Sequence, residues 1–252
     1  MKFRTDLADE NEKFSESFLS QTKRFGEIEI KKIHFDSADN FIFYFDPNLL
    51  SFCAKDFKKA CIYALSSLAP KRFSKVLVCG LGNPDITSDS FGPKTAEKIL
   101  VTAHMKKESA ANNIREISSF SPDVAGKTGI ESFDLIKSAL SHTNAELLIA
   151  IDSICTSDPK KLCSALQFSS GGITAGSGLK KHKTKLCKET LNVPVIAVGM
   201  PTVIDMGQFA ENGIDLSVTP LDIDILIKNP AKNLSSAINA FLTGGLFTSA
   251  LE

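Results

Sequence analysis

Three short runs of consecutive apolar residues constrain the fold of this chain more than any other feature. They are "KVLVCG" at 75–80, "LLIAID" at 147–152 and "VPVIAVG" at 193–199. A strand with one solvated face alternates apolar and polar residues, whereas an unbroken apolar run suits a strand that is covered on both faces. We therefore predict a mostly parallel central sheet built around these three segments.

Segments between and after these runs have the apolar spacing of amphipathic helices. We predict helices at 92–107 and 131–142, and a third at 219–245 with Thr219 as its N-cap and a kink or break at Pro230. Strands that alternate with helices imply right-handed crossovers and helices on both faces of the sheet. The predicted fold class is α/β, a three-layer sandwich.

The first seventy residues carry weaker signals. The stretches 27–35 and 40–45 alternate enough to predict a hairpin at one edge of the sheet, and 56–68 has a helical pattern. No Pro-, Ser- or Gly-rich tract divides the chain, so residues 1–252 are expected to form a single α/β domain.

Charge and hydropathy argue against several classes of protein. The 29 basic and 29 acidic side chains cancel, which leaves no overall positive field for nucleic acid or an anionic membrane. The apolar runs are far shorter than the ~20 residues of a membrane span, and the polar start does not resemble a secretory signal. The six cysteines and four histidines form no CxxC or HExxH pattern. We expect a cytoplasmic protein with no metal or other cofactor.

Two aspartates lie where the predicted sheet would place a functional site. Asp152 ends the second apolar run, and Asp89 lies in "GLGNPDITSDSFGP" (80–93), which follows the first run. Chemistry gathers at the carboxyl ends of parallel strands, so these carboxylates could converge there. Two neighbouring carboxylates share one proton, and one can then activate water while the other protonates an amide. The alternative is that each only caps a helix or turn, and the residues alone leave both interpretations open.

Two glycine-rich loops allow further interpretations. The first lacks the third glycine of a dinucleotide-binding loop and has Asp85 at that position, where a carboxylate would repel a pyrophosphate. The second, 169–185, ends in a basic stretch that contains Lys180 and Lys181. This stretch is either a solvated helix start or a patch that attracts an acidic substrate.

Six blocks of this sequence resemble those of the spore germination protease family, whose members degrade small acid-soluble spore proteins. The blocks are "GLGNPDITSDSFGP", "SPDVAGKTGIES", "LLIAIDS", "GITAGSG", "NVPVIAVGMPTVID" and "VTPLDID". The family loop has the form GLGN-x5-D-x-x-GP, whose acid falls on Asp89, and its strand-end acid falls on Asp152. The resemblance implies that these two residues are the catalytic pair of an aspartic-type endopeptidase. We expect substrate-binding residues in the two glycine-rich loops, at Asn83, Asp85, Gly176, Ser177, Lys180 and Lys181.

The start of the chain adds to the resemblance. "RTDLADE" at 4–10 is similar to the point at which the family's zymogen is cut, which places the scissile bond between Asp6 and Leu7 and makes residues 1–6 a short propeptide. The family's substrates are cut after an acid and before an apolar residue, with further acids beyond. The resemblance also implies a homo-oligomer in the cytoplasm of the spore core or forespore, with small acid-soluble spore proteins as substrates.

The chain departs from the family pattern in two places. Thr174-Ala175 stands where the family usually has His-Pro, and only 206–217 joins two blocks that the family normally separates by a long insertion. The fold implied is phosphorylase/hydrolase-like and also resembles the hydrogenase maturation peptidases, whose metal-recognising acid matches Asp89. The alternatives are therefore a peptidase of that second kind, or a non-catalytic relative that binds acidic peptides.

Overall fold

The computed structural model describes residues 5–10, 19–105, 114–174, 184–205 and 217–244. The strands are β1 Leu19–Phe25, β2 Ile28–Phe35, β3 Ala38–Tyr44, β4 Lys75–Gly80, β5 Glu116–Phe120, β6 Leu147–Cys155, β7 Ala165–Ser169, β8 Val195–Asp205 and β9 Ser217–Val218. The α-helices are α1 Ala54–Leu68, α2 Phe91–Ala96, α3 Ala125–Thr128, α4 Ser132–Thr143, α5 Lys188–Leu191 and α6 Ile223–Thr243. Three 3-10 helices matter below: η1 Ala8–Glu10, η3 Thr87–Asp89 and η4 Pro159–Lys161. No helix in these ranges is long and apolar enough to cross a bilayer.

The three apolar runs become β4, β6 and β8, which are direct neighbours at the centre of the sheet. The strand order is β1-β2-β3-β7-β8-β6-β4-β5, and β9 pairs with β8. β8, β6, β4 and β5 run parallel, while β7, β3, β2 and β1 are joined by antiparallel pairing. The predicted mostly parallel centre is confirmed, and an antiparallel half extends it on one side.

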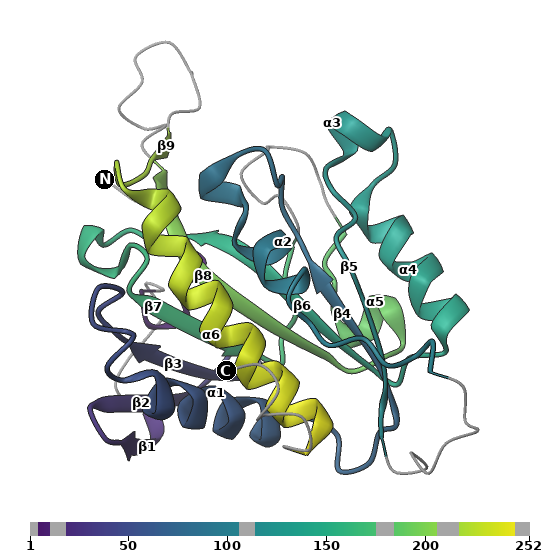
Figure 1. Ribbon diagram of the computed structural model, residues 1–252, viewed down its shortest axis with the longest axis horizontal. Coiled ribbons are helices and arrows are strands. Elements are labelled where there is room, and N and C mark those ends of the chain that lie inside the picture. The colour runs from purple at the N-terminus through teal and green to yellow at the C-terminus, as the bar shows by residue number, and fades with distance from the viewer. Residues whose placement is uncertain (1–4, 11–18, 106–113, 175–183, 206–216, 245–252) are drawn as a thin grey trace.

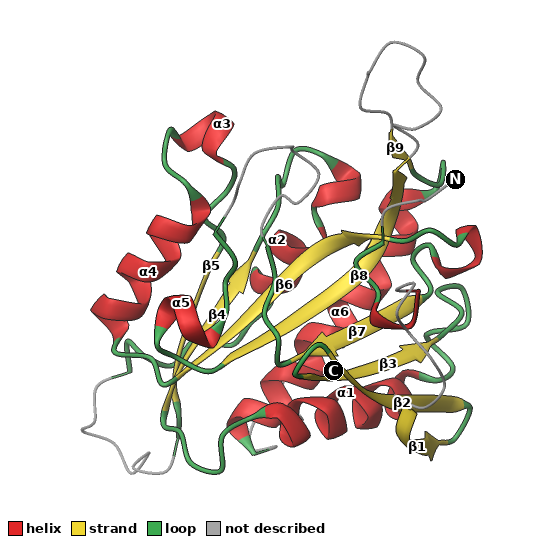
Figure 2. Ribbon diagram, turned by 180° about the vertical axis from the view of Figure 1, so that it is seen from behind, coloured by secondary structure: helices red, strands yellow, loops and turns green. Residues whose placement is uncertain are grey.

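Helices cover the sheet on both faces, which confirms the predicted three-layer α/β arrangement. α1, α2 and α6 lie across the face that Figure 1 shows in front, and α1 and α2 both contact α6. α4 and α5 lie on the opposite face, which Figure 2 brings to the front. Because both faces of β4, β6 and β8 are covered, no polar alternation is needed along these strands.

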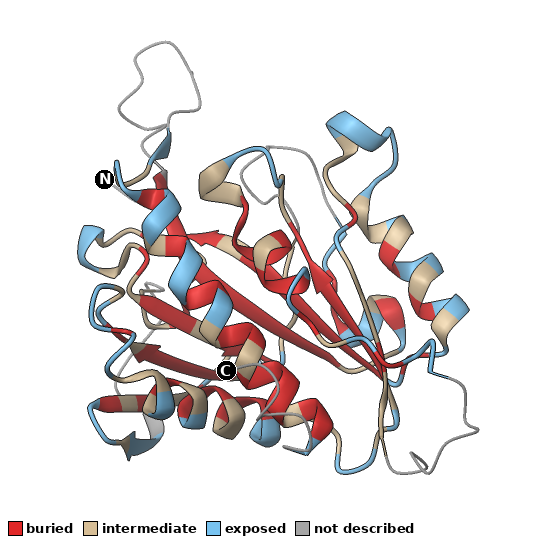
Figure 3. Cartoon of the chain, in the orientation of Figure 1, coloured by how far each residue is buried: buried red, intermediate tan, exposed pale blue. Residues whose placement is uncertain are grey.

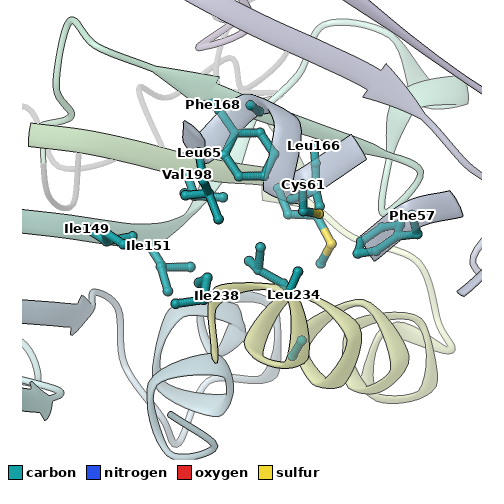
Figure 4. Packing of buried hydrophobic residues seen from close by; sticks show 14 of the residues in the cluster. Phe57, Cys61, Leu65, Ile149, Ile151, Leu166, Phe168, Val198, Leu234 and Ile238 are labelled. Atoms are coloured by element: carbon teal, nitrogen blue, oxygen red, sulfur yellow. The ribbon is translucent and has the colours of Figure 1, made fainter. Parts of the chain in front are cut away.

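The core follows from the alternation of side chains along each strand. In β6, Ile149 and Ile151 join the cluster under α1 and α6, whereas Leu148 and Ala150 join the cluster under α4 and α5. The central strands are buried along most of their length (Figure 3). Figure 4 shows the first cluster, in which Phe168 and other sheet residues point toward helical side chains. This packing is what fixes the positions of the strand ends.

The predicted helix at 92–107 is wrong beyond its first turns, since α2 ends at Ala96. A tertiary contact replaces the helical hydrogen bonds: the buried Asn239 side chain of α6 accepts from Leu100 N at 2.8 Å and donates to Lys98 O at 3.0 Å. Thr102 N then donates at 3.0 Å to the carbonyl oxygen of Ile117 in β5. Apolar spacing could not reveal these partners, because they lie far away along the chain.

Two smaller expectations also fail. Thr219 does not cap the last helix; its hydroxyl donates to Thr202 O at 2.9 Å, and α6 begins only at Ile223 with Asp222 at the N-cap position. The predicted break at Pro230 is wrong, because α6 continues through this residue as one helix, while a kink there stays a prediction. The helix at 131–142 is confirmed as α4, and the helix at 56–68 lies within α1. The predicted hairpin forms as β2–β3, but β1 lies outside it at the edge.

Candidate active site

The candidate site lies at the carboxyl ends of β4, β6 and β8. Asp152, in β6, is 4% exposed, and its Cα pairs with that of Gly199 in β8. Ser153 N donates to Asp152 Oδ1 at 2.9 Å. One residue earlier, Ile151 O accepts from Leu81 N at 2.7 Å, so the loop that leaves β4 starts at the same rim of the sheet.

That loop carries Asp89 back against the rim. Asn83 N donates to Asp89 Oδ2 at 2.7 Å, which fixes the carboxylate across the loop. Gly82 has φ +111°, and a Cβ there would lie 2.0 Å from the Asp89 carbonyl oxygen, so the loop needs glycine at this position. Thr202 of β8 donates to Ser88 O at 2.6 Å, and η3 contacts both β6 and β8. Asp89 and Asp152 therefore lie at the same end of the sheet.

The exposed side of the same loop is tied to α3. Lys127 Nζ lies 2.8 Å from Asp85 Oδ2 and 2.7 Å from Asp123 Oδ2, and it donates to Asn83 Oδ1 at 3.5 Å. Hydrogen bonds to the two acids raise the pKa of Lys127. Asp85 and Asn83, both predicted to bind substrate, thus serve at least to hold the loops after β4 and β5 together.

A cavity of about 220 Å³ opens beside Asp152. Asp152 follows Leu148 and Ala150 at intervals of two, so its side chain belongs to the face that α4 and α5 cover further along. Among the described residues that line the cavity, Asp89 is absent. The polar residues that line the cavity are Asp6, Asp152, Gln167, Ser169, Thr174 and Lys185.

The N-terminal segment (residues 5–10) docks at this cavity. Asp6 N donates to Cys155 O at 3.1 Å, and Cys155 N donates to Asp6 Oδ2 at 2.9 Å, so Asp6 is held against the end of β6 by main chain and side chain. Asp6 and Asp152 line the same cavity. The chain's own start therefore occupies part of the candidate site.

Gln167 of β7 holds the main chain of this segment. Its Nε2 donates to Asp6 O at 3.1 Å, and its Oε1 accepts from Ala8 N at 2.7 Å. These two bonds span Leu7, whose side chain is 1% exposed. The Asp6–Leu7 peptide bond, singled out from the sequence, is thus fixed beside the cavity, and the two Gln167 bonds involve only main-chain atoms of the segment.

Burial and charge also affect a cysteine beneath the site. Cys79 is fully buried at the end of β4, and burial together with the negative charge of Asp152 raises the pKa of its thiol. This keeps Cys79 a neutral packing residue. Within the described ranges, no three His, Cys, Asp or Glu side chains come together as a metal site would require.

The departure at Thr174 and the predicted substrate-binding residues of the second glycine-rich loop fall on different parts of the chain. Thr174 lines the cavity, so the departure from the family's His-Pro pattern falls inside the candidate site. Four predicted substrate-binding residues lie outside the described residues: Gly176, Ser177, Lys180 and Lys181.

Sequence reasoning missed two residues that organise the site, Gln167 and Lys161. Gln167 interrupts the apolar strand "ALQFS", and that interruption was a signal that could have been used. Lys161 binds Asp9 and Glu10 of the N-terminal segment, as detailed below. It stands beside Lys160 in η4, and nothing in the sequence distinguishes the two.

The comparison with protein families decides which group this site belongs to. A family model described as germination protease matches residues 42–241, which include Asp89 in η3 and Asp152 in β6. The chain belongs to the germination protease family. The matched region contains the end of β3, all of β4 to β9 and most of α6, so the family assignment rests on the central sheet rather than on the N-terminal segment.

Curated germination proteases from several bacteria are similar to this chain. The protein from Caldanaerobacter subterraneus subsp. tengcongensis is 34% identical over 228 residues, which cover 72% of this chain and 70% of that protein. Those from Bacillus cereus (strain G9842) and Bacillus pumilus (strain SAFR-032) are 35% and 37% identical, over 73% and 64% of this chain. The chain spans about half the length of these Bacillus relatives, 48% and 44%.

A solved structure is also similar, at a greater distance. It is the [NiFe] hydrogenase maturation protease HycI from Thermococcus kodakarensis KOD1, with a TM-score of 0.42 and 16% sequence identity over 68% of this chain and 94% of that one. A likeness this distant supports no statement about activity.

Proposed function

We propose that this chain is an endopeptidase that hydrolyses small acid-soluble spore proteins. The observation that carries the proposal is the docking of the chain's own segment "TDLADE" at the cavity that Asp152 lines, at the sheet end that also carries Asp89. The sequence of that segment has the acid–apolar–acid pattern of the proposed substrates. Membership of the germination protease family supports the same activity.

In the proposed aspartic-type mechanism, Asp89 and Asp152 share one proton. The ionised carboxylate takes a proton from water as the water oxygen bonds to the carbonyl carbon of the substrate. The protonated carboxyl then gives its proton to the amide nitrogen as the carbon–nitrogen bond breaks. The position of both carboxylates at the same end of the sheet supports this division of roles.

Gln167 has a place in the same mechanism. If the Asp6–Leu7 bond is the one that is cut, the Asp6 oxygen to which Gln167 donates is the carbonyl oxygen that gains negative charge. We propose that Gln167 positions and polarises this carbonyl in substrates as it does in the chain's own segment. Asn83, Asp85, Gly176, Ser177, Lys180 and Lys181 remain the proposed contacts for the rest of the substrate.

We further propose that the chain is a precursor that is cut between Asp6 and Leu7 and acts in the cytoplasm of the spore core or forespore as a homo-oligomer. The docked segment supports the first of these points, because its Asp6–Leu7 bond lies beside the cavity. The proposed cellular location and the proposed homo-oligomer are supported only by the resemblance of the sequence to the family.

The experiment mixes the purified full chain with a small acid-soluble spore protein and identifies new termini by mass spectrometry. We expect cuts after an acid and before an apolar residue, and a loss of several orders of magnitude in rate for Asp89→Asn and for Asp152→Asn. Asp134→Asn, an exposed acid on α4, is the matched control and should cut at the normal rate.

A second candidate is a non-catalytic relative that binds acidic peptides. The observation that favours it is Thr174, which lines the cavity where the family usually has histidine. Binding of the spore protein without new termini after hours of incubation would support this candidate and contradict the peptidase.

A further inference from the structure

Two acids of the N-terminal segment converge on one lysine. Lys161 Nζ lies 3.1 Å from Asp9 Oδ2 and 3.2 Å from Glu10 Oε1. The three side chains are mostly buried, with 17% of Lys161, 16% of Asp9 and 6% of Glu10 exposed. Buried charges of this kind need close partners, so the position of Lys161 depends on carboxylates being present.

The strand end after β6 completes the binding of Glu10. Thr156 Oγ1 donates to Glu10 Oε1 at 2.6 Å, and both the main-chain N and the hydroxyl of Ser157 donate to Oε2, at 2.7 and 2.5 Å. Burial would raise the pKa of Glu10, but the hydrogen bonds from Ser157 and Thr156 lower it to about 2. This set of donors therefore selects an ionised carboxylate.

Asp9 is bound less completely. Tyr44 of β3 donates to Asp9 Oδ2, the same oxygen that Lys161 approaches. The other oxygen, Oδ1, is buried and has no hydrogen-bond partner among the residues that the structure describes. A buried acceptor without a partner costs free energy, so the segment is not an optimal occupant of this site.

The contacts also define a spacing. Gln167 binds main-chain atoms on either side of Leu7, and Leu7 itself is buried. The acids that reach Lys161 come two and three residues after that apolar residue. Since the Gln167 contacts involve no side chain of the segment, any peptide with the same spacing could make them.

We propose that Lys161, Thr156, Ser157 and Tyr44 form a subsite for peptide carboxylates two and three residues after the buried apolar residue, and that the chain's own Asp9 and Glu10 block it. The substrate-reading role rests on the proposed peptidase function. The binding role and the self-blocking role do not depend on hydrolysis. Lys161 is thus a specificity-determining residue, and the N-terminal segment is an autoinhibitory contact.

The test is a fluorescence-anisotropy titration with two synthetic peptides, "RTDLADE" and its neutral counterpart "RTDLANQ". The unsubstituted chain should bind the acidic peptide weakly. The full chain carrying Asp9→Asn and Glu10→Gln should bind it at least tenfold more tightly, because its own segment no longer competes, and at least tenfold more tightly than the neutral peptide. Mass spectrometry after each titration reports whether the peptide was cut, so loss of binding and loss of hydrolysis are read separately.

The matched pair of variants is Lys161→Gln and Lys160→Gln, each added to the doubly substituted chain. Lys160 is the exposed neighbour in the same turn. We expect at least a tenfold loss of affinity for Lys161→Gln and none for Lys160→Gln. Equal affinity for the two peptides, equal effects of the two lysine variants, or no binding of the acidic peptide would overturn the proposal. If Lys161→Gln does not fold, the comparison of the two peptides decides alone.

Discussion

Gln167 binds the N-terminal segment through both the nitrogen and the oxygen of its side-chain amide, so this single residue contributes two hydrogen bonds to the docking of that segment. It donates to Asp6 O and accepts from Ala8 N, although its neighbours in β7 are apolar and buried. Replacing it would leave a main-chain donor and acceptor without partners near the cavity. The cost of losing such partners is about 1–3 kcal/mol when the groups stay buried.

We expect Gln167→Leu to loosen the segment without unfolding the sheet. Amide hydrogen exchange at Ala8 should become roughly 5- to 150-fold faster, which corresponds to about 1–3 kcal/mol of lost docking free energy. Gln21→Leu, at an exposed position in β1, is the control and should leave this exchange rate unchanged. Unaltered protection of Ala8 in Gln167→Leu would show that the two hydrogen bonds do not hold the segment.

At the scale of an element, the docking of the N-terminal segment depends on pH through Glu10. Its pKa in the docked state is about 2, lowered from 4.5. A lowered pKa stabilises the docked state fully above about pH 4.5, and this contribution is lost as the pH falls toward 2. Around Glu10, the neighbouring groups are Lys161 and Asp9, with Asp158 close to Tyr44.

We therefore expect the segment to undock as the pH falls from about 4.5 to 2, before or together with unfolding of the sheet. NMR signals of the Leu7 methyl groups and the Ser157 amide would report it. In Glu10→Gln the same signals should lose most of their pH dependence, because the titrating group is gone. A pH dependence that survives in Glu10→Gln would assign it to another acid.

A second element-scale feature is the end of α2, which depends on Asn239 of α6. We expect Asn239→Leu to destabilise the protein by about 1–3 kcal/mol, because Lys98 O and Leu100 N lose their partner. Urea unfolding measures this. Asn233→Ala, which removes only a bond to Asn229 O one turn earlier in the same helix, should change stability by less than about 0.5 kcal/mol. Equal effects would mean that α2 ends for another reason.

At the scale of the whole molecule, the central sheet could be predicted because a strand that is buried on both faces has an unbroken run of apolar residues. The runs that became β4, β6 and β8 needed no partner to be recognised. The placement of Asp89 and Asp152 at one end of the sheet followed from strand direction alone. Their catalytic roles remain a proposal that rests on the family and on the docked segment.

Features that depend on distant contacts could not be predicted. α2 ends early because Asn239, far along the chain, supplies hydrogen bonds. Nothing in the sequence shows that β7 joins the antiparallel half to β8, or that Lys161 rather than Lys160 binds the acids of the N-terminal segment. In each case the tertiary fold determines the partner, and the pattern of neighbouring residues in the sequence does not indicate it.

The central claim is that Asp89 and Asp152 act together on one water molecule. Its most direct test is a double-mutant comparison of kcat/KM for cleavage of a small acid-soluble spore protein by Asp89→Asn, Asp152→Asn and the chain carrying both. When two residues act as a unit, the effects of replacing them are not additive. Each single variant should therefore lose several orders of magnitude in kcat/KM, and the double variant should be no slower than the slower single variant. A single variant that keeps near-normal kcat/KM, or losses that multiply in the double variant, would contradict the shared mechanism.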